Sequence, residues 1–219
     1  MLRALFIKEG NAIWISHLDT MRLFQRAFKR SGLLLKHTQG FNPRPSVSIA
    51  MPLSVGVESN CELLDFELDG QTVSCQEIMD RLNNTLIQGI SVLSVYEGGR
   101  KLKELKYLRC ILTLEYDYGL PEGAEDEIRN LFAQPELLVE KKGKSGPVQQ
   151  NIIPMIKHLE VSTCNANTLM LEAMICCQEP SLNPAQLITA VHTYLPHNKP
   201  DHSKCRRVEL YDGQESIFR

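Results

Sequence analysis

The segment from Ser16 to Gly56 has the residue types and spacing of a surface that binds a polyanion. After Asp19 it contains no carboxylate before Glu58, although the whole chain carries a net charge of −2. Removing acids from one segment of a nearly balanced protein concentrates positive potential there, and such potential attracts nucleic acids. RNA is the leading candidate ligand, and we expect no DNA. The cations of the segment are Arg22, Arg26, Lys29, Arg30, Lys36 and Arg44.

A loop with the sequence Gly-Phe-Asn-Pro-Arg-Pro, at 40–45, offers a second kind of contact. Its two prolines restrict the backbone, so Phe41 could stack on a base and Arg44 could contact a phosphate or a base edge, as in sites for single-stranded RNA. The alternative is a structural loop in which Phe41 plugs the core. The predicted nucleic-acid site comprises Arg22, Arg26, Lys29, Arg30, Lys36, Phe41, Asn42 and Arg44.

Two histidines flank the basic residues and raise the question of catalysis. If His17 and His37 approach one another, they could cleave RNA through its 2′-hydroxyl by general acid–base chemistry, with Asp19 as an orienting group. They could equally form hydrogen bonds at a helix cap. Nothing in the sequence shows that either histidine has a tuned pKa.

Two other groups of side chains include metal-ligand types. Alternation along a predicted strand places Asp65, Glu67 and Asp69 on one face, and an outward polar face explains them better than a magnesium site does. The second group, near the carboxyl end, matches no known ligand spacing. We therefore predict no metal and no cofactor. The two groups are Glu62, Asp65, Glu67 and Asp69, and His192, His197, His202 and Cys205.

Predicted strands and helices alternate in both halves of the chain, and these elements would position the residues named above. In the first half the pattern predicts a helix that Ser16 caps and Gly32 ends, and a second helix over 74–85. The apolar stripe of the first helix consists of Leu18, Met21, Phe24, Ala27 and Phe28. Strands are predicted at 2–8 with a continuation at 12–15, and at 33–37, 47–51, 61–68 and 90–96.

The second half repeats the alternation without a convincing residue-level repeat. Strands are predicted at 107–116, 137–142, 168–177 and 206–212, and helices at 124–133, 152–159 and 183–193, with a lysine-rich turn at 141–147. The predicted fold class is α+β, with two tandem ferredoxin-like (split β-α-β) units. The predicted domains are an N-terminal one at 1–98 with the basic helix and the loop, a basic linker at 99–106, and a C-terminal one at 107–219.

Composition is ordinary for a soluble globular protein, with 43% hydrophobic and 23% charged residues. The apolar run at the amino terminus meets Lys8 and is too short for a signal peptide, and no stretch approaches the roughly 20 apolar residues of a membrane span. We expect a cytoplasmic protein. Its seven cysteines have irregular spacing without a CxxC motif, which predicts reduced thiols and argues against an iron–sulfur cluster.

Residues 16–68 resemble the bacterial radical-SAM-linked protein family, a domain of unknown function. The resemblance implies an accessory role in RNA modification or processing beside a radical-SAM partner protein, without an established activity. The chain lacks the three-cysteine motif of a radical-SAM cluster, so it is not that enzyme on its own. The pattern consists of Ser16-His17-Leu18-Asp19, Arg22, Arg26, Arg30, Gly40-Phe41-Asn42-Pro43, Pro52-Leu53, Gly56, Glu58-Ser59, Glu62 and Asp65.

Three functions remain open at this point. The first is a binding module that binds structured or single-stranded RNA and presents it to the radical-SAM partner. The second is a metal-independent ribonuclease or RNA-modifying enzyme that uses His17 or His37. The third is a protein–protein adaptor whose basic face docks on an acidic partner without binding RNA.

Overall fold

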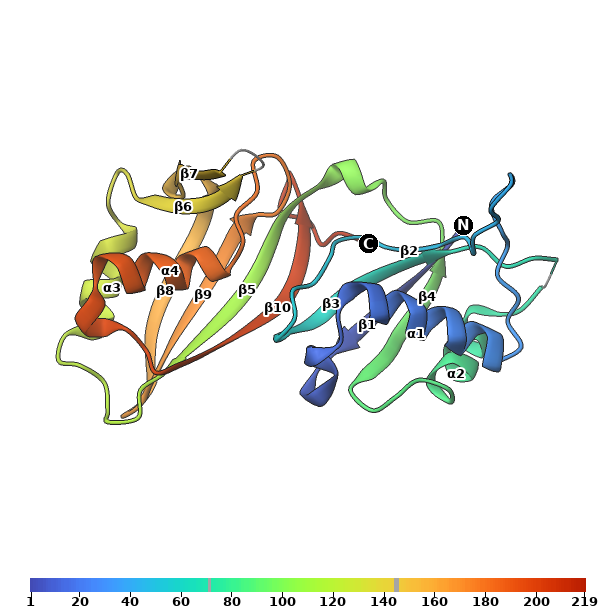
Figure 1. Cartoon of the computed structure of the whole chain (residues 1–219), viewed down its shortest axis with the longest axis horizontal. Helices are drawn as coiled ribbons and strands as arrows, with labels where there is room; N and C mark the ends of the chain where they lie inside the picture. Colours follow the sequence, from blue (N-terminus) through green and yellow to red (C-terminus); the bar gives the residue numbers. More distant parts are fainter. Residues whose placement is uncertain (71, 144–145) are drawn as a thin grey trace. The chain divides into compact units, whose positions relative to one another are not determined.

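The computed structural model describes residues 1–70, 72–143 and 146–219, and these residues divide into two compact units. Unit 1 is Met1–Leu102 together with Arg219, and unit 2 is Lys103–Phe218 (Figure 1). The division falls inside the segment 99–106. Of the predicted lysine-rich turn at 141–147, Lys144 and Ser145 lie outside the described residues. No helix among the described residues is long and apolar enough to cross a membrane.

Apart from the segments 12–15 and 33–37, unit 1 follows the predicted order of strands and helices. Strand β4 pairs with β1, β1 with β3, and β3 with β2, and all three pairings are antiparallel. The register sets Leu2 opposite Phe66, and Val47 opposite Phe66 on the other edge of β3. The elements are β1 (Leu2–Lys8), the 3-10 helix η1 (Gly10–Trp14), α1 (His17–Arg30), β2 (Val47–Ile49), β3 (Val57–Phe66), α2 (Cys75–Asn83) and β4 (Ile90–Glu97).

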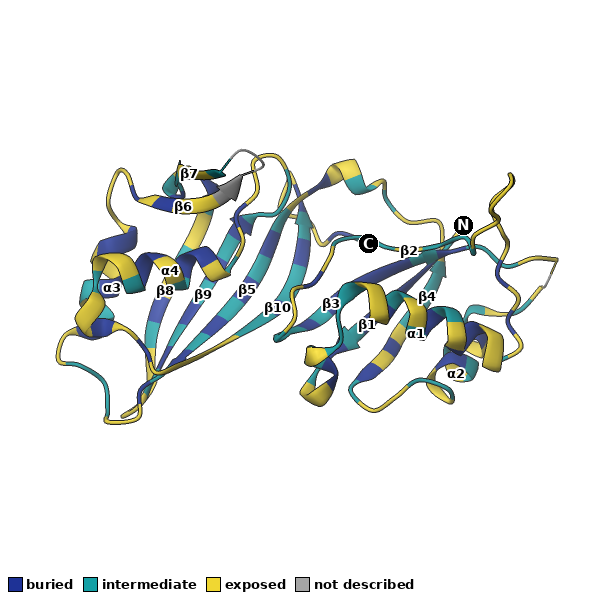
Figure 2. Ribbon diagram, in the orientation of Figure 1, coloured by how far each residue is buried: buried dark blue, intermediate teal, exposed yellow. Residues whose placement is uncertain are grey.

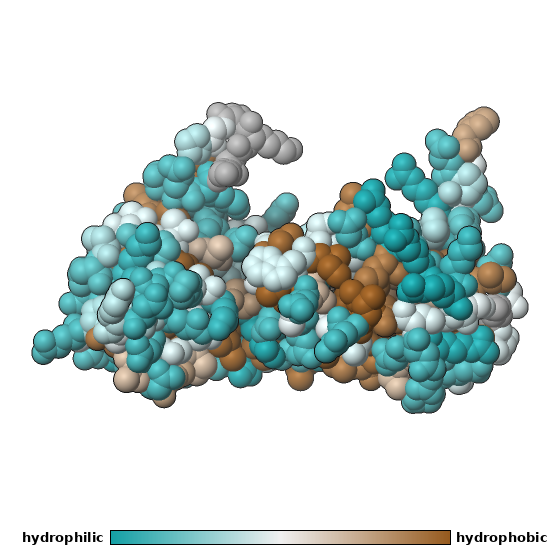
Figure 3. All heavy atoms as spheres, turned by 60° about the horizontal axis from the view of Figure 1, so that its bottom comes forward, coloured by the Kyte–Doolittle hydropathy of each residue, from teal (hydrophilic) through white to brown (hydrophobic). Residues whose placement is uncertain are grey.

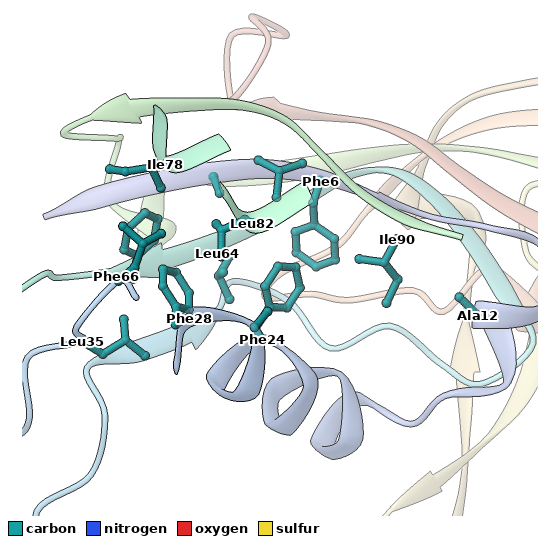
Figure 4. Packing of buried hydrophobic residues seen from close by; sticks show 14 residues of the cluster. Phe6, Ala12, Phe24, Phe28, Leu35, Leu64, Phe66, Ile78, Leu82 and Ile90 are labelled. Atoms are coloured by element: carbon teal, nitrogen blue, oxygen red, sulfur yellow. The ribbon is translucent and has the colours of Figure 1, made fainter. Parts of the chain in front are cut away.

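One hydrophobic core fills the space between the sheet of unit 1 and both of its helices (Figure 4). Phe24 of α1 meets Phe6 of β1 edge to face with ring centroids 4.7 Å apart, and Phe28 meets Phe66 of β3 at 4.9 Å. Aromatic pairs at such separations add to the free energy gained by burial. The predicted stripe of α1 is correct at Phe24, Ala27 and Phe28, which are all buried.

Leu18 departs from the predicted stripe, because 57% of its surface is exposed. At 100° per residue, Leu18 lies over the same side of the helix as Arg22, four residues later, rather than with Phe24 and Phe28. The first turn of α1 therefore presents an apolar side chain to solvent.

Two predicted strands of unit 1 are wrong. The segment 12–15 belongs to η1 and its end, because both ladders of β1 stop at Lys8 and the chain beyond has no strand to pair with. The buried Lys8 ammonium instead donates a hydrogen bond to the Ile15 carbonyl, with 2.5 Å between Nζ and O. The segment 33–37 makes isolated bridges, Leu35 to Leu68 and His37 to Pro45.

A buried ion pair joins the two central strands of unit 1. Arg3 is 1% exposed, and its Nε and Nη2 donate to the two carboxylate oxygens of Asp65 at 2.5 and 2.9 Å. Its Nη1 donates to the Arg100 carbonyl at 3.0 Å. The hydrogen bonds with Asp65 raise the pKa of Arg3 against the opposing effect of burial. Asp65 is therefore an ion-pair partner rather than part of an outward polar face.

Gly99 makes room for this arrangement. Its φ of +112° lies where L side chains are strained, and a Cβ at this position would stand 2.8 Å from Cζ of Arg3. The backbone beside it is also fixed from the far end of the chain, because the Arg100 N–H donates to the Arg219 carbonyl at 2.9 Å.

Unit 2 has a similar pattern of pairing with one insertion. Strand β10 pairs with β5, β5 with β9, and β9 with β8, all antiparallel, while β6 and β7 form a separate hairpin. The elements are β5 (Leu105–Glu115), α3 (Ala124–Phe132), β6 (Leu138–Gly143), β7 (Gly146–Asn151), β8 (Ile156–Asn165), β9 (Thr168–Cys176), α4 (Ala185–Tyr194) and β10 (His202–Asp212), with 3-10 helices η2 (Leu102–Glu104), η3 (Ile153–Met155) and η4 (Pro196–Asn198).

The helix predicted at 152–159 is wrong. The 3-10 turn η3 occupies its start, and β8 follows from Ile156. Within the sheet of unit 2, β8 pairs with β9, and most of its residues are exposed or half-buried, as Figure 2 shows. A strand without a fully buried face lacks the apolar alternation from which a strand is recognised.

We predict that Asp65→Asn lowers the free energy of unfolding by roughly 3 kcal/mol, because it leaves the Arg3 guanidinium buried without a counter-charge. The exposed pair of Lys36 and Glu67, 2.9 Å apart, is the matched control, and Glu67→Gln should leave the urea midpoint unchanged. Urea titrations followed by tryptophan fluorescence measure both. Equal midpoints for the two variants would contradict the role of the buried pair.

Candidate nucleic-acid interface

Local hydrogen bonds fix the start of α1, which carries half of the residues of the predicted site. Ser16 is the N-cap: its Oγ accepts from the Asp19 N–H at 3.1 Å and donates to Asp19 Oδ2 at 2.7 Å. These bonds satisfy a backbone donor that the helix itself leaves unpaired. At the other end, Lys29 and Arg30 occupy the last turn, where cations interact favourably with the helix dipole.

The cations of α1 follow one another along the side of the helix that faces away from the core. Arg22, Arg26 and Arg30 stand four residues apart, a step of about 6 Å along the axis, and all three are exposed. Figure 2 shows exposed residues along the length of α1. Because Phe24 and Phe28 are buried on the opposite side, the guanidinium groups have to face solvent.

These arginines border one open groove of about 470 Å³, which we call the arginine groove. Its volume lies within the range of small-ligand sites. Its cations come from α1, and its apolar walls come from the end of η1, from α1 and from the segment that leads into β4. The lining residues are Ile15, Asp19, Arg22, Leu23, Arg26, Arg30 and Ile87.

The arginine groove keeps a net positive charge, with three guanidinium groups against one carboxylate. Arg22 Nη1 lies 2.9 Å from Asp19 Oδ1, but both side chains are more than half exposed, so water competes with the pair. The Ser16 hydroxyl, followed by Arg22, lowers the pKa of Asp19. Arg30 donates to the Thr85 carbonyl at 2.6 Å. Arg26 makes no ion pair or hydrogen bond with any described residue.

The loop at 40–45 is exposed throughout its first five residues and is not part of the groove lining. Phe41 is fully exposed, so the alternative in which it plugs the core is wrong. The base of the loop is closed by two hydrogen bonds, from the Thr38 N–H to the Arg44 carbonyl at 2.8 Å and from the Arg44 N–H to Thr38 Oγ1 at 3.0 Å. Asn42 and Arg44 are exposed, as Phe41 is. Figure 1 shows the segment 40–45 projecting from unit 1.

The two remaining lysines of the predicted site differ in their surroundings. Lys36 forms an ion pair with Glu67, whose carboxylate raises the pKa of the lysine. A carboxylate thus stands 2.9 Å from its ammonium group, although both side chains are exposed to water. Lys29 is exposed and has no ion-pair partner within the described part of the chain. The structure thus brings Arg22, Arg26 and Arg30 together, and it leaves the loop and Lys36 outside that group.

The predicted histidine pair does not form. His17 lies by Glu62 of β3, whereas Lys36, the neighbour of His37, binds Glu67, five extended residues or roughly 16 Å further along the chain. His17 instead borders a small cavity near Lys8, Thr20 and Glu62. This cavity measures about 10 Å³, about the smallest size that holds one water molecule. It has no room for a nucleotide.

The histidines of the second group also have separate surroundings. His197 Nε2 lies 2.5 Å from Glu127, and His202 Nε2 lies 3.6 Å from Asp117. Burial lowers the pKa of His192, whose Nε2 has no hydrogen-bond partner among the described residues. The described part of the chain contains no cluster of three or more His, Cys, Asp or Glu side chains that could hold a metal ion.

Sequence reasoning missed the apolar walls of the arginine groove. Leu23 could have been found, because it stands four residues after Asp19 on the same side of the helix. The sequence contains no such signal for Ile15 and Ile87. Ile15 reaches the groove through the turn before α1, and Ile87 reaches it through the loop between α2 and β4.

A family model described as "Uncharacterized protein conserved in bacteria (DUF2344)" matches residues 1–184. The chain belongs to this family. The residues that the family model matches make up most of the sequence, and they include the arginine groove and all elements of unit 1. A comparison with curated proteins finds no match.

Among solved structures, the chain is similar to one chain of the "Crystal Structure of a Cbf5-Nop10-Gar1 Complex", with 11% identity and a TM-score of 0.51, over 94% of this chain and 48% of that one. A second similar structure is "Structure of H/ACA RNP bound to a substrate RNA containing 2'-deoxyuridine", with 12% identity and a TM-score of 0.44, over 98% and 58% of the two chains. The chain thus spans about half the length of these structures. At such identities the first likeness concerns the fold alone.

We predict that Ser16→Ala frays the first turn of α1 and lowers the free energy of unfolding by about 1 kcal/mol. Ser74 is the matched control, because it caps α2 by accepting from the Glu77 N–H at 3.2 Å. Hydrogen exchange should quicken at 19–21 in the first variant and at 77–79 in Ser74→Ala. Unchanged protection at 19–21 in Ser16→Ala would show that the cap does not position the groove.

Proposed function

We propose that this family member is an RNA-binding accessory module, which presents an RNA substrate to a radical-SAM partner protein in RNA modification or processing in the cytoplasm. The observation that carries the proposal is the arginine groove. Three guanidinium groups at regular spacing border it, and a single carboxylate opposes them. Arginine presents a planar fork of donors that matches phosphate oxygens.

The loop at 40–45 supplies a second contact in this proposal. Its exposed Phe41 offers a ring for stacking, and the Arg44 side chain, which has no ion pair or hydrogen bond among the described residues, offers a cation for the backbone of the RNA. Asn42 lies between them with donors and acceptors for a base edge. Lys29 adds a further cation in the last turn of α1, at the end of the helix that leads toward the loop.

The radical-SAM partner rests on the resemblance of residues 16–68 and on the missing cluster motif. A module that binds RNA without a reactive group of its own needs a second protein to carry out the chemistry. The two-histidine ribonuclease has no geometric support, because His17 and His37 lie by different parts of the chain around β3.

The finer fold class is also part of the proposal. We infer two tandem ferredoxin-like units, in domains 1–98 and 107–219 joined by the segment 99–106. The strand order β4-β1-β3-β2 in unit 1 supports this inference. In unit 2 the order β10-β5-β9-β8 supports it as well, once the β6–β7 hairpin is treated as an insertion.

Charge reversal in the arginine groove tests RNA binding. For single-stranded RNA, neutralising three phosphates predicts a slope of about −2 for log K against log salt concentration. Arg22→Glu combined with Arg26→Glu should abolish detectable binding and remove most of that slope. Anisotropy of a labelled oligonucleotide at several salt concentrations measures both quantities.

The control is Arg81→Glu, which is compared with the single variant Arg26→Glu because both change the net charge by the same amount. Arg81 is a half-exposed arginine of α2 in the same unit; it is paired with Glu77 and is not a lining residue of the groove. The variant Arg81→Glu changes the net charge of unit 1 in the same direction and should leave the affinity for RNA nearly unchanged. Equal losses in the two cases would mean that net charge alone, rather than the groove, attracts RNA.

Co-purification from a bacterial lysate tests the partner. A radical-SAM protein should accompany the wild-type chain, and RNA should be recovered with the complex. A complex that persists unchanged after nuclease treatment while the purified chain binds no RNA would favour the adaptor function instead. Absence of any radical-SAM protein from the complex would remove that part of the proposal.

A further inference from the structure

Trp14 is the single tryptophan of the chain, and 67% of its surface is exposed. It ends η1, and the next residue, Ile15, lines the arginine groove. An indole ring is among the largest apolar groups a protein can bury, and leaving it in water forgoes that free energy. Trp14 is not itself a lining residue of the arginine groove, but its place directly before Ile15 makes it a candidate for contact with a ligand that extends beyond the groove.

The backbone around Trp14 holds it in place. Lys8 Nζ binds the Ile15 carbonyl at 2.5 Å, and the Ile15 N–H donates to the Ala12 carbonyl at 3.0 Å. On the other side, the Gly56 N–H donates to the Ile13 carbonyl at 2.9 Å. The tryptophan is thus anchored through both of its sequence neighbours, which reduces the conformational entropy that a ligand would have to remove.

Gly56 also determines how close the ring lies to the backbone. Its φ is +83°, and a Cβ at residue 56 would stand 3.4 Å from Cζ3 of Trp14. The edge of the indole therefore rests against a turn that carries no side chain at this point. This contact supports the ring from the protein side while two thirds of its surface remains open to solvent.

The surface near Trp14 changes from apolar to cationic along α1. Leu18 and Val55 are exposed as well, and Leu18 precedes Arg22, Arg26 and Arg30 at steps of four residues on the same side of the helix. On the half of Figure 3 that shows unit 1, hydrophobic and hydrophilic residues lie side by side on the surface. A ligand that covers both needs flat apolar groups and a chain of negative charges.

Single-stranded nucleic acid has this combination, because its bases are free to stack on aromatic rings while its phosphates follow a cationic track. Bases in a duplex are already stacked and paired and cannot reach an indole. We propose that Trp14 is a base-stacking platform at the amino-terminal end of the arginine groove, and that the site accordingly takes single-stranded RNA in preference to duplex RNA. This inference rests on the proposed RNA binding and names its substrate class.

The fluorescence of Trp14 reports directly on the proposed contact, because no other tryptophan contributes. A single-stranded uridine 12-mer should quench the emission of the full-length protein, and a 12-base-pair RNA duplex at the same phosphate concentration should not. An oligomer of the same length without bases should bind more weakly and should not quench. Quenching by the duplex equal to that by the single strand would overturn the inference.

Three aromatic variants separate stacking from folding. Trp14→Leu should weaken binding of the 12-mer roughly tenfold, whereas Trp14→Phe keeps a ring and should recover most of the affinity. Phe41→Leu tests the loop independently: it should weaken binding of the 12-mer, while a saturating concentration of the 12-mer still quenches Trp14. Urea midpoints of all three should match the wild type, since both positions are exposed; for Trp14→Leu and Trp14→Phe, far-UV circular dichroism replaces fluorescence.

The outcomes distinguish this inference from the proposed function. If the Arg22→Glu and Arg26→Glu double variant loses RNA while Trp14→Leu binds as the wild type does, the groove binds RNA and Trp14 is not its platform. If neither change affects binding, RNA recognition by the groove is itself wrong. If Trp14→Leu and Trp14→Phe weaken binding equally, the position matters for shape and not for stacking, which also overturns the inference.

Discussion

The packing of one side of α1 against β1 and β3 is the constraint on which the arginine groove depends. Phe24 and Phe28 are fixed by the rings of Phe6 and Phe66, so the rotation of the helix about its axis is set by the core. With that rotation fixed, the positions four residues apart on the opposite side have to face water. The cationic track is thus a geometric result of aromatic packing, and its stability is that of the core of unit 1.

A buried amine at the end of the same core connects it to the groove. Lys8 is 2% exposed and shares a sheet face with Phe6; burial lowers its pKa, while the charge of Glu62 across the strands acts in the opposite direction. Burying an ammonium is costly unless it is well paired. Here it fixes the carbonyl of Ile15 and so the junction between η1 and α1. This junction determines where Trp14 and the first wall of the groove lie.

How much the sequence could predict depends on whether the signal was local. The apolar period of α1, except at Leu18, and its cap at Ser16 are local signals and were predicted correctly. The error at 12–15 arose because strand pairing ends at Lys8, which depends on residues far along the chain. Ile87 reaches the groove through the path of the chain after α2, and the separation of His17 from His37 follows from the different parts of the chain around β3 by which they lie. Neither is visible in residue type alone.

The pairing of β10 with β5 has a consequence for how the chain is made. Every strand and helix of unit 1 is complete by Glu97, whereas unit 2 needs contacts such as that of Lys204 with Glu115, which are 89 positions apart. Domains generally fold as units during translation, from the amino terminus onward. All strands and helices that pack around the cationic helix are therefore translated before the last strand of unit 2.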